Sequence, residues 1–195
     1  MTEIFNITND LKLGLLDLKA YSIQGALSTK RDIETRGRNF LLAELIDPDC
    51  SIFYDEKGKP HLVNDSRHIS ISHSHDRLAI IVNNNEPTGI DIELIRNKVL
   101  RIKHKFLSQE ELVDAQDDIE KLLIYWAAKE TLYKIYGLKE VDFIEHLFVK
   151  AFNKQQQGVI SGMINLANFR EAYQLHYQVL PEYVLVYAHT KLQLC

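Results

Sequence analysis

The spacing of hydrophobic residues in the first half of the chain predicts a mixture of helices and strands. Leucines recur every three or four residues from Leu11 to Leu18, which predicts a helix over residues 10–18. A second helix is expected from Ser28, a residue type that caps helices, to Ile46. Short apolar or alternating runs predict strands at residues 4–7, 52–54, 69–72, 78–82 and 89–95. The last three of these strands are expected to form one meander.

The second half of the chain has the pattern of helices followed by a sheet. Ser108 and Glu111 have the spacing of a capping box, which predicts a helix that starts at Ser108. Either Asp117 or Asp118 is expected to cap a longer helix, which Gly137 ends. Strands are predicted at residues 143–152, 158–166, 173–180 and 183–189. The two halves together predict an α+β protein with a lobe boundary near residues 96–100.

Composition excludes several classes of protein. The 195 residues are long enough to bury a core, and 46% apolar with 26% charged residues is ordinary for a globular protein. Acidic residues outnumber basic ones by 27 to 23, which argues against a general nucleic-acid binder. The two cysteines, Cys50 and Cys195, are too few for a disulfide framework. No signal peptide or membrane-spanning run is visible, so we expect a cytoplasmic protein.

Two carboxylates lie close together on one predicted strand. Asp91 and Glu93 are two residues apart, so their side chains point to the same face, and Ile90 and Ile92 point to the other. Two adjacent carboxylates repel each other unless a cation lies between them, and oxygen ligands at this spacing suit Mg²⁺. The spacing alone favours a solvated strand edge that carries two acids, so the metal site stays open at this point.

The long helix after residue 118 contains a third candidate carboxylate. At 100° per residue it has one apolar stripe, formed by Ile119, Leu123, Trp126 and Ala127. Glu130 falls within this stripe, where a carboxylate is costly unless it is paired or bound to a metal. Lys134 lies one turn further on the same face, so a plain Glu–Lys pair is the alternative. Lys129 lies about 100° around the helix and is expected to be a solvated cation or one at the rim of the site.

Small polar residues follow the strand at residues 69–72. Ser72 and His73 can hydrogen-bond a phosphate, although polar residues also end many strands without any such role. His68, His73 and His75 are a possible zinc cluster, but their spacing matches no common zinc pattern. The Gly58–Pro60 segment is a turn with a lysine at its tip.

The order of these segments resembles a known family. The blocks are GKP (58–60), ISISHS (69–74), TGIDIE (88–93), FLSQEE (106–111) and WAAKETLYKIYG (126–137). In this order they resemble the 4′-phosphopantetheinyl transferase superfamily, in its surfactin-synthetase-activator (Sfp-type) branch. The resemblance covers roughly residues 58–137, and its G-I-D-x-E and W-x-x-K-E-x-x-x-K blocks are specific when they occur together.

The resemblance implies an enzyme and a set of site residues. Members of the family transfer the phosphopantetheine arm of coenzyme A to a serine of an apo acyl or peptidyl carrier protein and release adenosine 3′,5′-bisphosphate. Asp91, Glu93 and Glu130 match the family's Mg²⁺ carboxylates, and Glu130 is the candidate general base. Lys134 matches the lysine that contacts the transferring phosphate.

The resemblance also implies contacts with the nucleotide of coenzyme A. His73 and Ser72 match residues that hold its 3′-phosphate, and Lys59 matches the lysine of the GKP block. Among the basic residues of the N-terminal helix, Arg38 is the one we assign to the nucleotide phosphates. The apo carrier protein is expected to dock near Phe106-Leu107, beside Lys103 and Lys105, although ordinary interlobe core is an equal interpretation of that apolar pair.

The family's longer members imply a pseudo-dimer of two similar lobes, each a small, mostly antiparallel sheet packed on helices. The expected lobes are residues 1–97 and 98–195, tightly joined with one active site between them, in a monomer. A catalytically silent regulator that binds coenzyme A or a carrier protein is the alternative function. A Mg²⁺-dependent nucleotide phosphohydrolase is a third, because it uses similar acids.

Overall fold

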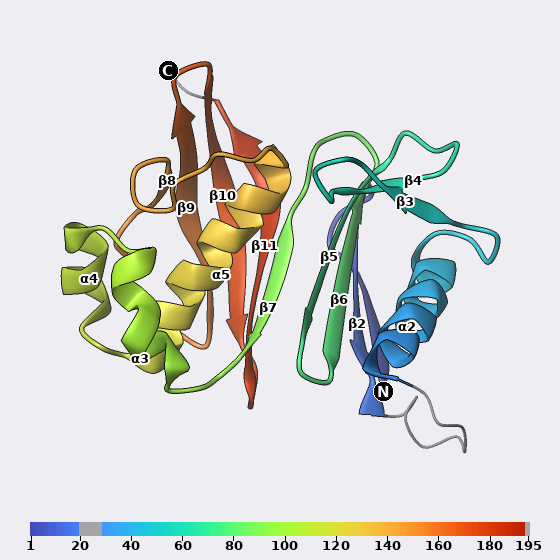
Figure 1. The fold of residues 1–195 in the computed structure, drawn as a ribbon, viewed down its shortest axis with the longest axis horizontal. Helices are drawn as coiled ribbons and strands as arrows, with labels where there is room; N and C mark the ends of the chain where they lie inside the picture. Colours follow the sequence, from blue (N-terminus) through green and yellow to red (C-terminus); the bar gives the residue numbers. More distant parts are fainter. Residues whose placement is uncertain (20–28, 194–195) are drawn as a thin grey trace. The chain divides into compact units, whose positions relative to one another are not determined.

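The computed structural model describes residues 1–19 and 29–193, and the chain divides into two compact units, Met1–Thr88 and Gly89–Cys195. Each unit is built on an antiparallel sheet, with one described helix packed against the sheet of the first unit and several helices in the second (Figure 1). The α+β class expected from the sequence is therefore confirmed. No helix in the described part of the chain is long and apolar enough to span a membrane.

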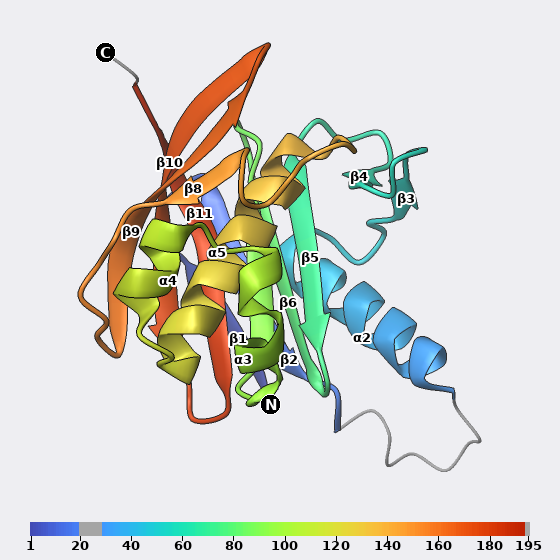
Figure 2. The same cartoon turned by 60° about the vertical axis from the view of Figure 1, so that its left-hand side comes forward.

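The sheet of the first unit has the strand order β1-β2-β6-β5, and the helix α2 packs against it (Figure 1). A short hairpin, β3-β4, lies next to β5 (Figure 2). The elements are β1 (Thr2–Asn6), β2 (Leu11–Asp17), α2 (Lys30–Leu45), β3 (Ile52–Tyr54), β4 (Pro60–Leu62), β5 (His68–Ser74) and β6 (Arg77–Asn83). The strands expected at 4–7, 52–54, 69–72 and 78–82 are thus confirmed, with shifts of a few residues at their ends.

The helix expected over residues 10–18 is wrong, because this segment is the strand β2 between β1 and β6. Leu13, Leu15 and Leu16 are all buried, so the strand is covered on both faces and its leucines need not alternate with polar residues. Gly14 allows α2 to approach, since a Cβ there would lie 2.7 Å from a methyl group of Leu41. A strand buried on both faces has no strict period of two, and its leucine spacing imitated a helix.

The cap of helix α2 is one residue after the predicted cap. Thr29 caps it, and the side chain of Asp32 accepts a hydrogen bond from the Thr29 backbone in return, which completes a capping box. Ser28, the predicted cap, lies outside the described residues. Leu41, Leu42 and Leu45 are buried against the sheet, as their spacing predicted.

The sheet of the second unit has the order β7-β11-β10-β9-β8, and the long helix α5 crosses one of its faces (Figure 1). The elements are β7 (Ile90–Leu94), α3 (Lys98–Ile102), the 3₁₀ turn η1 (Lys103–Lys105), α4 (Gln109–Ala115), α5 (Ile119–Tyr136), β8 (Leu147–Val149), β9 (Gln157–Leu166), β10 (Phe169–Val179) and β11 (Tyr183–Leu192). The strand expected over 143–152 is shorter than predicted, and the three that follow it are confirmed.

The strand β7 does not continue a meander with β5 and β6, as the sequence suggested. It pairs antiparallel with β11, from Ile90 opposite Tyr187 to Leu94 opposite Tyr183. The compact units therefore divide at Thr88 and Gly89, whereas the expected lobe boundary was residue 97. This pairing matters for the site, because it fixes Asp91 and Glu93 to the same sheet that supports α5.

Local signals in the second unit predicted the ends of its helices correctly. Ser108 and Glu111 form a reciprocal capping box at the start of α4. Asp118 caps α5 through the backbone N–H of Lys121, and Gly137 ends the helix in the left-handed conformation with φ of 68°. These ends set the phase of α5, which decides which of its side chains face β7.

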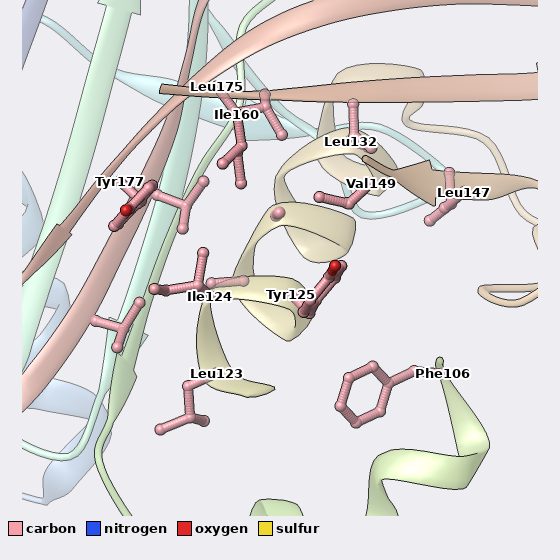
Figure 3. Packing of buried hydrophobic residues seen from close by; sticks show 14 of the residues in the cluster. Phe106, Leu123, Ile124, Tyr125, Leu132, Leu147, Val149, Ile160, Leu175 and Tyr177 are labelled. Atoms are coloured by element: carbon pink, nitrogen blue, oxygen red, sulfur yellow. The ribbon is translucent and has the colours of Figure 1, made fainter. Parts of the chain in front are cut away.

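The core of the second unit is built around α5. Ile124, Tyr125 and Leu132 of this helix pack among residues of the sheet and Phe106 (Figure 3). Gly89 lets the chain pass close to α5, because a Cβ at this position would lie 2.3 Å from the carbonyl oxygen of Thr131. A backbone oxygen cannot move aside easily, so the glycine of the TGIDIE block is required for this close packing.

Candidate functional site

The carboxylates of Asp91 and Glu93 both lie on the face of β7 that α5 covers. Each makes a hydrogen bond with a side chain of that helix, and the strand alternates, so Ile90 and Ile92 are buried on the opposite face. Asp91 is 4% exposed and Glu93 is half-buried. The predicted shared orientation of the two acids is therefore observed, and the acids are not a solvated strand edge.

Lys134 joins α5 to β7 at Asp91. Its ammonium donates to Asp91 Oδ1 at 2.7 Å and to the carbonyl oxygen of Ile90 at 2.9 Å. The alternative from the sequence was a pair with Glu130 along the helix surface, but the ion pair runs across to the strand instead. Lys134 therefore brings a positive charge into the carboxylate cluster.

Glu130 has an unusual environment for a carboxylate. Burial, together with the negative charges of Asp91 and Glu93, raises its pKa from the ordinary 4.5 to about 7, although the positive charge of Lys134 opposes this shift. The effect of both strand acids on this pKa means that Glu130 is close enough to Asp91 and to Glu93 to be repelled by each. A carboxyl group with a pKa near neutrality can accept a proton at physiological pH, as a general base does.

Glu93 contacts the same helix through Trp126. The indole N–H donates to Glu93 Oε1 at 2.7 Å. A pocket of about 180 Å³ opens beside this pair, with apolar walls that include Leu123 and Trp126 and with Arg96 and Lys98 at its polar side. Glu93 is therefore one of the residues that line this pocket.

The three acids fit a divalent cation by their chemistry. They supply hard carboxylate oxygens only, and they repel one another in the absence of a positive charge between them. Within residues 1–19 and 29–193, however, no group of three or more histidine, cysteine or acidic side chains lies close enough together to hold a metal ion, and this includes the three acids as they stand in this structure. The zinc alternative at His68, His73 and His75 likewise has no such arrangement in this part of the chain.

Lys129 is not the solvated cation that the helical projection suggested. It is fully buried, and its ammonium donates to Glu111 Oε2 at 2.7 Å and to the carbonyl oxygens of Phe106 and Phe143 at 2.8 Å each. The projection was wrong because α5 is covered on several sides, so a residue 100° from the main stripe also points into the core. The W-x-x-K spacing was the only sequence signal for this role.

Phe106 and Leu107 are core residues of the second unit, so they do not form the exposed carrier-docking surface that we considered. They are 1% and 2% exposed, and the ring of Phe106 packs edge-on against Trp126. Lys103 pairs with Asp117, while Lys105 is exposed. The apolar pair stabilises the packing of the turn η1 on α5.

Two predicted nucleotide-binding residues lie near the hairpin β3-β4. Lys59 lies in the turn between these strands, where burial lowers the pKa of its ammonium. Arg38 extends from α2 and donates to the Tyr54 hydroxyl at 3.4 Å, and Tyr54 pairs with Pro60 of the same hairpin. Arg38 and Lys59 are thus each close to the hairpin β3-β4.

The other two predicted nucleotide-binding residues are on β5. Ser72 is 6% exposed, whereas the His73 side chain is 49% exposed and lies 3.4 Å from Glu34 Oε1 on α2. Successive residues of a strand point to opposite faces, so the two side chains do not face one phosphate together. The pKa of His68, at the start of β5, is lowered mainly by burial of its imidazole and next by the positive charge of Lys59. Lys59 is therefore near this end of the strand. His73 is five residues further, about 17 Å along the strand.

Comparisons with known proteins match the part of the chain that contains the three acids. The sequence model of the 4′-phosphopantetheinyl transferase superfamily matches residues 87–188, which include all three acids and Lys134. The chain is 31% identical over 107 residues to the 4′-phosphopantetheinyl transferase gsp of Aneurinibacillus migulanus. That match covers 51% of this chain and 44% of the relative, so the chain spans less than half of the relative's length.

Proposed function

Because the chain belongs to the 4′-phosphopantetheinyl transferase superfamily, we propose that it transfers the phosphopantetheine arm of coenzyme A to a serine of an apo carrier protein. Adenosine 3′,5′-bisphosphate is the second product. The carboxylate cluster of Asp91, Glu93 and Glu130, joined by Lys134, is the observation that carries the proposal. Binding alone does not require three neighbouring acids, whereas phosphoryl transfer uses such acids to hold the divalent cation that neutralises the phosphate charge.

Asp91, Glu93 and Glu130 would hold the Mg²⁺ ion. When bound, the ion supplies the positive charge that neutralises the pyrophosphate as its leaving group departs. Lys134 stabilises negative charge on the oxygens of the transferring phosphoryl group, from its position beside Asp91. The cluster thus combines three ligands with one fixed cation.

Glu130 is the proton acceptor in this proposal. The serine oxygen of the carrier forms a bond to the β-phosphorus of coenzyme A, and the bond from that phosphorus to the bridging oxygen of the nucleotide breaks. The hydroxyl proton passes to the Glu130 carboxylate, directly or through a water molecule. In the metal-free protein the pKa of Glu130 is about 7, well above that of an ordinary glutamate.

The nucleotide of coenzyme A is assigned to residues of the first unit. Lys59 and Arg38 supply positive charge near the hairpin, and His73 supplies a hydrogen-bond donor to the 3′-phosphate. Ser72 contributes through its backbone, because its side chain points to the opposite face of β5 from His73. We further propose that the chain works as a cytoplasmic monomer.

The test is a direct measurement of the product. The protein is incubated with coenzyme A, Mg²⁺ and an apo carrier protein, and the carrier is weighed by mass spectrometry. We expect the carrier to gain the mass of one phosphopantetheine group when it is incubated with the wild-type protein, and to gain none with Asp91→Asn. An unmodified carrier that still binds the protein indicates the silent regulator, and cleavage of coenzyme A without a carrier indicates the phosphohydrolase.

A further inference from the structure

Trp126 of α5 contacts Glu93, but the catalytic proposal gives it no role. We propose that Trp126 is a positioning residue, whose indole N–H holds the Glu93 carboxylate in the orientation that a divalent cation requires. This inference rests on the proposed function, because it takes Glu93 to be a metal ligand.

The contact between the two residues is direct. The indole nitrogen donates to Glu93 Oε1 at 2.7 Å, and an indole has only this one donor. A carboxylate that is held through one oxygen has its plane and its second oxygen fixed. Hydrogen bonds of this kind to metal-binding side chains orient the ligand and raise its affinity for the ion.

The indole itself is held on two sides by aromatic rings. Phe106 contacts it edge-on, with ring centroids 4.9 Å apart, and Phe143 stacks on it at 5.6 Å with an interplanar angle of 25°. Phe106 precedes α4, and Phe143 follows α5, so the clamp is made from segments far apart in the sequence. The ring of Trp126 therefore has one orientation, and its N–H points at Glu93.

The two clamping residues are fixed in turn by the buried Lys129. Its ammonium binds the backbone carbonyl oxygens of both Phe106 and Phe143, and Glu111 supplies its counter-charge. Glu111 also accepts a hydrogen bond from the backbone of Val149, which ties the network to β8. One buried ion pair therefore sets the backbone of both rings that hold the indole.

The alternative is that Trp126 serves only to fill the core. Trp126→Phe separates the two roles, since it keeps an aromatic ring in the clamp and removes the N–H. Binding of Mn²⁺ alone is measured by electron paramagnetic resonance, without coenzyme A or a carrier. We expect about tenfold weaker Mn²⁺ binding in Trp126→Phe. The matched control is Tyr136→Phe, which removes one polar hydrogen from the same helix and should leave Mn²⁺ binding unchanged.

The same Mn²⁺-binding measurement, repeated for Trp126→Phe in a protein that also carries Glu93→Gln, makes the test specific. If Trp126 acts through Glu93, Trp126→Phe should weaken Mn²⁺ binding in the wild type and have no further effect in Glu93→Gln. Equal losses in both backgrounds, or wild-type affinity in Trp126→Phe while Glu93→Gln is weakened, would overturn the positioning role and leave the proposed function intact.

The wild-type chain contains a single tryptophan, so its fluorescence reports on Trp126 alone. We expect paramagnetic Mn²⁺ to quench this fluorescence with the same affinity that resonance measures, and Asp91→Asn to weaken the quenching. Undiminished Mn²⁺ binding in both Asp91→Asn and Glu93→Gln would instead overturn the metal site itself, and with it the proposed function as well as the role of Trp126.

Discussion

Glu130 shows how the surroundings of one residue create chemistry that its type does not have. Its position within an apolar stripe predicted a costly carboxylate, and the structure finds it partly buried and close to two other acids. The sequence could indicate this because helical projection places Glu130 beside Trp126 and Ala127. It could not indicate the partner of Lys134, because Asp91 is more than forty residues away in the chain.

The raised pKa of Glu130 predicts how stability depends on pH in metal-free protein. Between pH 4.5 and 7 the unfolded carboxyl loses its proton while the folded one keeps it, so the free energy of unfolding falls as pH rises. The shift corresponds to about 3 kcal/mol for this one group. Urea unfolding at pH 5 and pH 8 in EDTA should show that Glu130→Gln lacks this loss. Parallel pH dependence in the two proteins would contradict the raised pKa.

Lys134 predicts a separation between metal binding and catalysis. Lys134→Ala removes the ammonium that contacts Asp91, so we expect a loss of about 1–3 kcal/mol of stability. The single-turnover rate should fall strongly, because the charge acts in the transition state, while Mn²⁺ affinity should not fall. The exposed Lys139, just beyond the helix, provides the control Lys139→Ala. A parallel fall in Mn²⁺ affinity would mean that Lys134 acts only by arranging Asp91.

At the scale of elements, local sequence patterns predicted where helices begin and end better than they predicted what packs against each helix or strand. Capping residues located the starts of α4 and α5 and the end of α5, because caps depend on neighbouring residues only. The same reasoning misassigned β2 as a helix and Lys129 as solvated. Both errors concern elements that are covered on several sides, and the cover comes from segments that a local pattern does not contain.

The buried ion pair of Lys129 with Glu111 predicts the cost of separating the elements that it joins. Lys129→Met leaves a buried carboxylate without its cation, so we expect the free energy of unfolding to fall by about 3–5 kcal/mol. Adding Glu111→Gln removes that unpaired charge and should recover part of the loss, since the amide oxygen can still accept a hydrogen bond. Urea unfolding of the single and double variants measures both effects. A loss below 1 kcal/mol in Lys129→Met would show that the network is not structural.

At the scale of the whole molecule, the order of short blocks predicted more than any single element did. The blocks from GKP to WAAKETLYKIYG identified the family, and the family model matches residues 87–188. Sheet pairing was not predictable in the same way, because β7 and β11 are about ninety residues apart and their pairing depends on the completed sheet. The spacing of the acids made them recognisable in the sequence. Their positions in the structure depend on the contacts that α5 makes with β7, and these contacts join residues far apart in the chain.

The position of His73 predicts that this residue contributes to binding of the nucleotide and not to the chemical step. Its half-exposed imidazole is available to a 3′-phosphate, which is remote from the reacting phosphorus of coenzyme A. His73→Ala should therefore raise the KM for coenzyme A by about 10–100-fold, the value of one charge-assisted hydrogen bond, and change kcat little. Dephospho-coenzyme A lacks that phosphate, so with this donor the variant and the wild type should have similar KM values. His75→Ala, at the exposed neighbouring histidine, is the matched control and should keep the wild-type KM for both donors. An equal penalty of His73→Ala on the two donors would remove His73 from the 3′-phosphate, and a loss confined to kcat would place it near the reacting group instead.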